Sequence, residues 1–532
     1  MTAKECIENG RAIFGMELGS TRIKAVLTDP EGQVLAIGMY DWENSLVDGI
    51  WTYSIEEIHE GLTGCYTALR EEVERVYGIT PTTYAAMGIS AMMHGYMPFD
   101  AEGNLLSRFQ TWRNTNTQDA ADALTELFDF NIPLRWTIAH LYQCMLDKEE
   151  HLQKADFVTL LSSYIHRLLT GERVVGIGDA SGMFPIDSEK LDFDEGMVQK
   201  FDELAASCGY DWKLRELFPK VLVAGDDAGC LTPEGAALLD SSGSLQPGIP
   251  FCPPEGDAGT GMVATNAVEQ RTGNVSAGTS FFAMIVLEKR LSRVYREIDM
   301  VTTPDGSPVA MSHSNNGTTD LNTWVGLFQE FAGLLGADAD LGKTFELLYR
   351  NSLSGDADCG GMIAYNYDAG ESMTGVNEGR PLFARMPGSR VTLANFIKTH
   401  LFASLGVVKM GLDILKSEDV KIDSILGHGG FFKTKEVGQR ALAAAVGAPV
   451  TVMETASEGG AWGIALLAAY MYEKKNGYTG RLGEYLASRI FSGLSGLTIA
   501  PTQEEIDGFE VFMDHYRAGL DAEKAAVSGM NW

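Results

Sequence analysis

The sequence has little cysteine, and its cysteines form no recognisable metal or disulfide pattern. The 532 residues include 7 cysteines, an odd number, without any Cys-x-x-Cys spacing. Scattered cysteines of this kind are typical of a reducing compartment and give no support to a structural zinc site. No apolar run approaches the length of a membrane helix, and the first residues, MTAKECIENGRA, lack the apolar region of a secretory signal. We therefore expect a cytoplasmic protein with no membrane partner.

Basic residues are also scarce. Lys and Arg number 41 against 72 Asp and Glu, which gives a formal net charge of −31. Nucleic acids and anionic membranes are bound by basic faces, so this balance argues against both as partners. It does not exclude a nucleotide, because Mg²⁺ and backbone N–H groups can neutralise phosphate locally. Two common nucleotide motifs are missing as well, GxxxxGK(S/T) of P-loop proteins and GxGxxG of dinucleotide-binding folds.

The chain has an ordinary globular composition, and its length favours two large domains. Hydrophobic residues make up 45% and charged residues 21%. Residues 12–40 are predicted to form strands on both sides of a turn at Gly19-Ser20. Apolar residues from Ile55 to Tyr77 follow helical spacing that ends at Gly78. Strands and helices continue to alternate, which predicts the α/β class.

The best predicted domain junction is a stretch rich in Ser, Pro and Gly at residues 241–256. It predicts an N-terminal domain at 1–256 and a C-terminal domain at 257–532. Glycine-rich loops within 310–425 have the composition of insertions on the second domain.

Three short turns of glycine and small polar residues stand out, together with one carboxylate. The turns are Gly19-Ser20-Thr21, Gly278-Thr279-Ser280 and Gly427-His428-Gly429-Gly430. Turns without bulky side chains expose backbone N–H groups, which bind anionic oxygens. Asp257 lies in a predicted glycine-rich loop, GDAGTG. A carboxylate near such turns indicates a base facing a phosphoryl group, although each turn alone is also compatible with a simple chain reversal.

Several motifs in a fixed order give the chain a clear resemblance to a known family. GMELGSTRIKAVL resembles the first phosphate hairpin of FGGY-family carbohydrate kinases, and GISAMMHGYMPFDAEGNLL resembles their sugar-contact strand. PGIPFCPPEGDAGTGMV is similar to the catalytic-aspartate loop, NVSAGTSFF to the second phosphate hairpin, and ILGHGGFFKTKEVGQRALAAAVGAPV to the adenosine motif. The resemblance covers residues 12–475. It implies two domains of the ribonuclease-H-like kind shared with actin and hexokinase, flanking a catalytic cleft.

The resemblance also implies a role for each matching residue. Asp257 would be the general base that takes the proton from a sugar hydroxyl as it attacks the γ-phosphate of ATP. Glu17 stands where the family usually has an aspartate associated with Mg²⁺ through water, so the metal geometry is open. The ATP contacts would be Gly19, Ser20, Thr21 and Lys24 for the β- and γ-phosphates, Gly278 and Thr279 for phosphate from the other domain, and Gly429 and Gly430 for adenosine. Glu458-Gly459-Gly460 would close the same pocket.

The sugar contacts are expected at Met93-His94-Gly95 and Trp112. Imidazole and backbone amides bind hydroxyls, while Met and Trp cover the apolar faces of a sugar. The Met-His-Gly triplet is similar to that of xylulokinase-like members, which makes D-xylulose the leading ketopentose. L-ribulose follows closely, because Trp112-Arg113-Asn114 departs from the usual Trp-Asn-Asp and the extended region 310–380 does not match a plain xylulokinase. A lone histidine after an apolar strand is more often a structural core residue, so this site rests on the whole triplet.

Two other classes of function stay open at this stage. An actin- or chaperone-like ATPase would use the same nucleotide turns without a sugar pocket. A catalytically weak sugar sensor is suggested by Glu17 in place of aspartate. The expected partners are thus a ketopentose and ATP, and a homodimer is left open.

Overall fold

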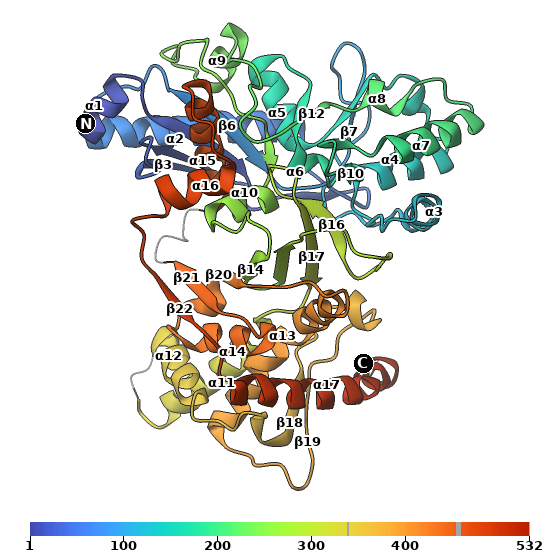
Figure 1. Cartoon of the computed structure of the whole chain (residues 1–532), viewed down its shortest axis with the longest axis vertical. Coiled ribbons are helices and arrows are strands. Elements are labelled where there is room, and N and C mark those ends of the chain that lie inside the picture. The colour runs from blue at the N-terminus through green and yellow to red at the C-terminus, as the bar shows by residue number, and fades with distance from the viewer. Residues whose placement is uncertain (338–339, 454–458, 531–532) are drawn as a thin grey trace. The chain divides into compact units, whose positions relative to one another are not determined.

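The computed structural model describes residues 1–337, 340–453 and 459–530, and Figure 1 shows the order of its elements. The chain divides into two compact units. Unit 1 comprises Met1–Val268, Asp299–Val309 and Ser457–Gly493, and unit 2 comprises Glu269–Ile298, Ala310–Ala456 and Leu494–Trp532. Among the described residues, no helix combines the length and apolarity needed to span a bilayer.

Unit 1 is built on a mixed sheet with the strand order β13-β6-β1-β2-β3. The predicted N-terminal strands are confirmed: β1 pairs antiparallel with β2, and β2 with β3. Strand β6 runs parallel to β1, and β13 runs parallel to β6. The strands of this sheet are β1 (Ile13–Leu18), β2 (Arg22–Thr28), β3 (Val34–Asp41), β6 (Ala86–Ala91) and β13 (Glu255–Gly256).

Helix α2 shows how local sequence fixes an element of this unit. Its bounds, Ile55–Tyr77, are those that the apolar spacing predicts. Ser54 and Glu57 form a capping box at its start, and Gly78 ends it in the left-handed conformation. Its apolar face packs on β2 and β3. The prediction for this helix is confirmed.

The other helices of unit 1 are α1 (Ala3–Glu8), α3 (Gln118–Phe128), α4 (Thr137–Leu146), α5 (Leu161–Thr170), α6 (Ile177–Ala180), α7 (Glu195–Ser207), α8 (Leu214–Leu217), α9 (Pro233–Leu239), α10 (Asp257–Ala264), α15 (Gly459–Lys475) and α16 (Leu482–Tyr485). Short strands complete it: β4 (Ser45–Val47), β5 (Ile50–Thr52), β7 (Met97–Phe99), β8 (Phe157–Thr159), β9 (Val174–Gly176), β10 (Ile186–Asp187), β11 (Asp192–Phe193), β12 (Lys220–Leu222) and β16 (Asp299–Thr302). Helix α15 comes from late in the chain and packs on β1, β6 and α10.

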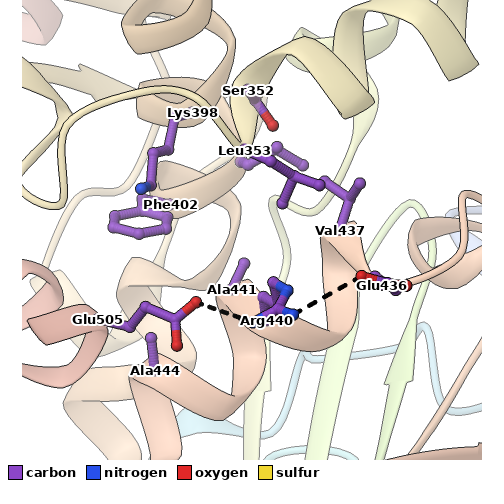
Figure 2. A pocket seen from close by; sticks show the side chains of 11 residues that line it. Ser352, Leu353, Lys398, Phe402, Glu436, Val437, Arg440, Ala441, Ala444 and Glu505 are labelled. Carbon is purple, nitrogen blue, oxygen red and sulfur yellow. Dashed lines mark hydrogen bonds and ion pairs between the residues drawn. The ribbon is translucent and has the colours of Figure 1, made fainter. Parts of the chain in front are cut away.

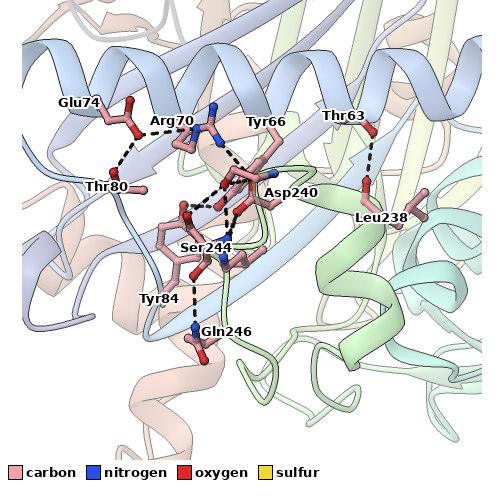
Figure 3. Close-up of polar contacts among 12 residues, drawn as sticks. Thr63, Tyr66, Arg70, Glu74, Thr80, Tyr84, Leu238, Asp240, Ser244 and Gln246 are labelled. Atoms are coloured by element: carbon pink, nitrogen blue, oxygen red, sulfur yellow. Dashed lines mark hydrogen bonds and ion pairs between the residues drawn. The ribbon is translucent and has the colours of Figure 1, made fainter.

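The Ser-rich stretch after α9 is held firmly inside unit 1. Asp240 is buried at its start and accepts hydrogen bonds from the backbone N–H groups of Ser242, Ser244 and Leu245. Arg70 of α2 donates a further bond to Asp240 over 3.2 Å (Figure 3). The chain passes to unit 2 only after Val268, and later segments return to unit 1. The domain limits 1–256 and 257–532 stay a prediction.

Unit 2 also contains a mixed sheet, with the order β17-β15-β14-β20-β21-β22. Strands β14 and β15 form the hairpin that the sequence predicts around Gly278. The strands of unit 2 are β14 (Thr272–Ala277), β15 (Phe281–Val286), β17 (Pro308–Ser314), β18 (Met362–Tyr365), β19 (Leu382–Arg385), β20 (Ser424–His428), β21 (Val450–Met453) and β22 (Gly496–Ile499). Its helices are α11 (Thr319–Leu334), α12 (Leu341–Ser352), α13 (Leu393–Ser417), α14 (Val437–Val446) and α17 (Gln503–Gly529). Each unit therefore combines helices with a mixed sheet, as the predicted α/β class requires.

Candidate active site

Asp257 is the first residue of helix α10, so the predicted loop at GDAGTG is wrong. Glycine suggested a loop, but here the small residues let α10 pack closely on α15. The Asp257 carboxylate accepts a hydrogen bond from the backbone N–H of Met93 over 3.1 Å. Burial raises the pKa of Asp257, and backbone N–H bonds from Met93 and Ala258 oppose that rise. The structure thus joins the predicted base to the predicted sugar-contact segment.

Glu17 lies beside Asp257 in the same unit. Burial, and then the charge of Asp257, raise the pKa of Glu17 to about 7, while the N–H of Ala461 and the charge of Lys24 act in the opposite direction. Lys24 is the cross-strand partner of Glu17 in the β1–β2 ladder. A side chain on Gly460 would come within 2.3 Å of a Glu17 oxygen, so it would displace the Glu17 carboxylate from its present position. The side chain of Glu17 is one methylene longer than that of aspartate. Gly460, at the start of α15, leaves room for it.

The donor set around Glu17 fits a magnesium ion that arrives with ATP. Mg²⁺ is usually held by one or two carboxylates, waters and substrate phosphates. The negative charge of Asp257 raises the proton affinity of the neighbouring Glu17 carboxylate. A bound cation would relieve the repulsion between these two carboxylates. Within the described parts of the chain, no cluster of three or more His, Cys, Asp or Glu residues forms a complete cage for a metal. The residues present fit a shared metal–phosphate site and do not form an all-protein one.

The predicted sugar triplet has an unusual backbone. His94 has φ of 70° and Gly95 has φ of 118°, in the region that favours glycine. A non-glycine residue held in this region often marks a functional site. The His94 ring is buried and stacks on Trp136 with ring centroids 6.5 Å apart. Burial and the nearby charge of Arg135 lower the pKa of His94, which keeps the imidazole neutral.

Two buried carboxylates next to Asp257 were missed by sequence reasoning. Asp179 lies in the short helix α6, and one of its oxygens accepts a hydrogen bond from Ser162. Its other oxygen lies 2.8 Å from the point that a side chain on Gly256 would occupy. Glu255 accepts hydrogen bonds from the N–H groups of Gly178 and Asp179 over 3.1 and 2.9 Å. The only sequence signal was their occurrence in glycine-rich segments, GIGDASG and PPEGDAG.

Replacing Glu255 by glutamine is expected to change how stability depends on pH. Burial raises the pKa of Glu255 to about 8 from a usual value of 4.5. Because the folded state keeps a proton that the unfolded chain releases above 4.5, this group's contribution to stability is complete below that pH. It is lost as the pH rises to about 8. Glutamine does not ionise, so Glu255→Gln should gain stability relative to the native chain by up to roughly 1.4 kcal/mol per pH unit in this window.

Urea denaturation at a series of pH values between 5 and 8 measures this difference. The matched control is Glu126→Gln on the exposed side of α3, which should run parallel to the native chain at every pH. A constant offset for Glu255→Gln, with no slope against pH, would contradict the prediction.

Aromatic side chains donate hydrogen bonds to the first glycine turn, Gly19-Ser20-Thr21. Trp42 donates to the carbonyl of Gly19 over 2.6 Å, and Tyr53 donates to the carbonyl of Ser20 over 2.5 Å. Trp112 donates to the Ser20 hydroxyl over 3.0 Å, so it contacts the first glycine turn. The sequence assigned Trp112 to the sugar, and the roles of Trp42 and Tyr53 were not foreseen because their partners are distant in sequence.

The two glycine turns of unit 2 lie next to each other. The carbonyl of Gly278 accepts a bond from the N–H of Thr318, and that of Thr279 accepts one from the N–H of Gly317. A side chain on Gly429 would come within 2.4 Å of the carbonyl of Ala277, the residue just before the Gly278 turn. Gly430 faces open space instead. The lack of a side chain at residue 429 is therefore explained by packing, whereas the space at residue 430 would admit one. Of the predicted closing segment, Glu458 lies outside the described residues.

The predicted adenosine motif also lines a cavity of unit 2. This cavity has a volume of about 340 Å³, and residues of α12, α13, α14 and α17 surround it (Figure 2). Arg440 of α14 faces Glu505 at 3.3 Å and Glu436 at 3.7 Å, so its charge is balanced within the cavity wall. None of the predicted site residues lines it.

Comparison with known proteins gives matches over most of the chain. The N-terminal domain model of the FGGY family of carbohydrate kinases matches residues 12–264, and the C-terminal domain model matches residues 273–472. L-fuculokinase of Escherichia coli (strain K12) is 24% identical over 295 residues, covering 51% of this chain and 56% of the relative. Xylulose kinase of Haemophilus influenzae is 22% identical over 445 residues, covering 79% of this chain and 83% of the relative. The chain thus spans about half the length of the L-fuculokinase relative.

Solved structures share the fold at low sequence identity. Ligand-bound xylulose kinase from Lactobacillus acidophilus superposes with a TM-score of 0.77 at 17% identity, covering 98% of this chain and 100% of that one. Glycerol kinase from Plasmodium falciparum with ADP gives 0.73 at 13% identity, covering 96% and 98%. These values establish the two-domain α/β fold. Because the two family models together cover more than half of its residues, the chain belongs to the FGGY family of carbohydrate kinases.

Proposed function

We propose that the chain is a kinase that transfers the γ-phosphate of ATP to the terminal hydroxyl of a ketopentose, with D-xylulose as the first substrate to test. One observation carries the proposal: Asp257 Oδ1 accepts a hydrogen bond from the backbone N–H of Met93, which begins the Met-His-Gly triplet. A hydroxyl bound at His94 would therefore lie near a carboxylate that can take its proton.

In the proposed reaction, the sugar oxygen forms a bond to the γ-phosphorus while the bond from that phosphorus to the β–γ bridging oxygen breaks. ADP leaves with the bridging oxygen, and the hydroxyl proton passes to Asp257. Such transfers have a loose transition state, so catalysis depends mainly on positioning and on charge. Glu17 would hold Mg²⁺ through water, and the bound ion supplies neutralisation of phosphate charge.

The nucleotide contacts expected from the sequence belong to the same proposal. Ser20 and Thr21 with Lys24 bind the phosphates in unit 1, and Gly278 and Thr279 bind phosphate in unit 2. Adenosine is bound next to Gly429 and Gly430. The catalytic cleft expected between the two domains and the cytoplasmic location stay predictions.

A coupled ADP-release assay tests this function. D-xylulose, L-ribulose, L-fuculose, glycerol, erythritol and hexuloses are compared at equal concentration. Turnover stimulated most by D-xylulose supports the proposal, and a preference for L-ribulose or L-fuculose keeps the kinase but changes its substrate. L-fuculose is included because of the L-fuculokinase relative. ATP hydrolysis without stimulation by any sugar would favour an ATPase of the actin or chaperone kind and remove the proposal.

Replacing His94 by asparagine is expected to weaken sugar binding more than catalysis. Asparagine tolerates positive φ, so the backbone of the triplet is kept while the ring that stacks on Trp136 is lost. We expect KM for the sugar to rise about tenfold, the effect of losing about 1.4 kcal/mol of binding, with a smaller change in kcat. Steady-state kinetics measures both values. His515→Asn, at an exposed position of α17, is the control and should leave KM unchanged. A fall in kcat at constant KM would contradict a binding role.

A further inference from the structure

The Gly278-Thr279 turn rests on a neighbouring loop of the same unit, residues 315–318, which joins β17 to α11. The N–H of Gly317 donates to the carbonyl of Thr279 over 2.7 Å. The N–H and the hydroxyl of Thr318 both donate to the carbonyl of Gly278, over 3.0 and 3.1 Å. A side chain on Gly317 would come within 2.3 Å of that carbonyl, so the two backbones are in direct contact. Any shift of the 315–318 loop therefore moves the turn.

This loop is held in its turn by residues 366–371, which follow β18. The side-chain amide of Asn316 donates to the carbonyl of Ala369 over 3.1 Å and accepts from its N–H over 2.9 Å. The side-chain amide of Asn366 donates to the carbonyls of Asn316 and Gly317 over 2.7 and 2.8 Å. Both asparagines are buried. Side chains from both segments thus fix the backbone of the loop.

Glu371, at the end of the same segment, binds the beginning of the loop. Its Oε2 atom accepts hydrogen bonds from the hydroxyl of Ser314 and the N–H of Asn315, over 3.1 and 2.9 Å. The same atom accepts a third from the side-chain amide of Asn316 over 3.2 Å. The Oε1 atom has no hydrogen-bond donor within the described parts of the chain. Because Glu371 is only 1% exposed, its removal would leave these donors buried without an acceptor.

We propose that Glu371 and Asn366 are positioning residues for nucleotide binding, which hold the Gly278-Thr279 turn in place through the loop between β17 and α11. Electrostatic recognition of a charged ligand depends on donors that are fixed before the ligand arrives. The inference rests on the proposed function, because phosphate binding at Gly278 and Thr279 is part of it. It assigns a task to one segment of the 310–425 region, whose glycine-rich loops have the composition of insertions.

The test compares replacements of Glu371 in the full chain. Binding of a non-hydrolysable ATP analogue with Mg²⁺ is measured by calorimetry, and KM for ATP and for the sugar by ADP release. In Glu371→Ala we expect the dissociation constant of the analogue and KM for ATP to rise about tenfold or more, since misplacement by about 1 Å can have an effect of about 10². KM for the sugar should stay native, because the expected sugar contacts lie in unit 1.

Glu371→Gln is the conservative variant and should bind the analogue as the native chain does. Its amide oxygen can accept the bonds of Oε2, and its NH₂ group takes the place of Oε1, where no other donor competes. Burial also raises the pKa of Glu371, so a neutral side chain suits this position. A second variant, Asn366→Ala, keeps Glu371 and removes two hydrogen bonds to the loop. It should weaken binding of the analogue by about threefold or more.

Glu523→Ala is the matched control. Glu523 of α17 is also buried in unit 2, and it accepts a hydrogen bond from the N–H of Arg380 over 2.8 Å. Its removal should lower the melting temperature without changing the affinity for the analogue. Thermal melting also checks that each of the other variants is folded.

Native affinity for the analogue in both Glu371→Ala and Asn366→Ala would overturn this inference and leave the proposed function intact. Equal losses in Glu371→Gln and Glu371→Ala would show that the hydrogen bonds do not carry the effect. An equal loss in Glu523→Ala would show a general loosening of unit 2, and either result rejects the positioning role. A native chain that binds the analogue but phosphorylates no sugar would remove the proposed kinase, and the binding measurements would still decide on Glu371. A native chain that does not bind the analogue would overturn both.

Discussion

Replacement of Asp257 by asparagine should lower turnover by about 10² to 10⁴ while leaving sugar binding in place, because general base catalysis contributes a factor of that size. Asparagine has nearly the same shape as aspartate and retains an oxygen that can accept the hydrogen bond from the N–H of Met93. It cannot accept the hydroxyl proton. The expected result is therefore a large fall in kcat with KM for the sugar close to that of the native chain.

Stability distinguishes this loss of chemistry from damage to the fold. Because burial raises the pKa of Asp257, the charged form is disfavoured, and a neutral side chain should not destabilise unit 1. Turnover is measured by ADP release, sugar affinity by calorimetry, and folding by thermal melting. The control is Asp119→Asn on the exposed surface of α3, which should behave as the native chain. Native turnover in Asp257→Asn would remove this residue from the role of base.

The pH dependence of turnover is a second test of Asp257 as the general base. A base acts only when deprotonated, so turnover should fall as the pH drops through the raised pKa of Asp257. This acid limb should begin at a higher pH than the usual value of 3.8 for an aspartate.

Local patterns made much of the fold predictable from the sequence. Helix α2 was predicted at its observed bounds, because its apolar spacing and Gly78 both indicate the same element. The hairpins at Gly19 and Gly278 were predicted for the same reason, since strand-forming residues flank a turn on both sides. The family resemblance itself is confirmed by the two family models, which match residues 12–264 and 273–472.

Contacts between distant segments were not predictable in this way. Tyr53 and Trp112 reach Ser20 from 33 and 92 residues away, and nothing in their local sequence indicates that partner. Asp179 becomes a neighbour of Asp257 only because α6 packs beside β13 and α10. The loop predicted at residue 257 failed for a related reason. Glycine in a sequence indicates either a turn or a close approach of two elements, and only the packing of α15 decides between them.

Helix α15 is the element whose packing places the candidate base. A side chain on Gly15 of β1 would come within 2.4 Å of the Ala461 carbonyl, so α15 lies very close to the central strand. On its other side, a side chain on Gly463 would come within 2.0 Å of the Thr260 carbonyl in α10. These are backbone contacts, which cannot be relieved by a change of rotamer. Because Asp257 begins α10, any displacement of that helix moves the carboxylate.

Replacement of Gly463 by alanine is therefore expected to reduce both stability and turnover. Overpacking costs about 1 to 3 kcal/mol or more, while alanine in a helix returns at most about 1 kcal/mol relative to glycine. A misplacement of catalytic groups by about 1 Å can reduce turnover by about 10². Thermal melting and ADP release measure the two effects. Gly261→Ala is the matched control, because Gly261 lies inside α10, the helix that Gly463 of α15 faces, but has open space where a side chain would lie, so alanine there should raise the melting temperature. If Gly463→Ala melts and turns over like the native chain, then the position of α10 and of Asp257 does not depend on this contact.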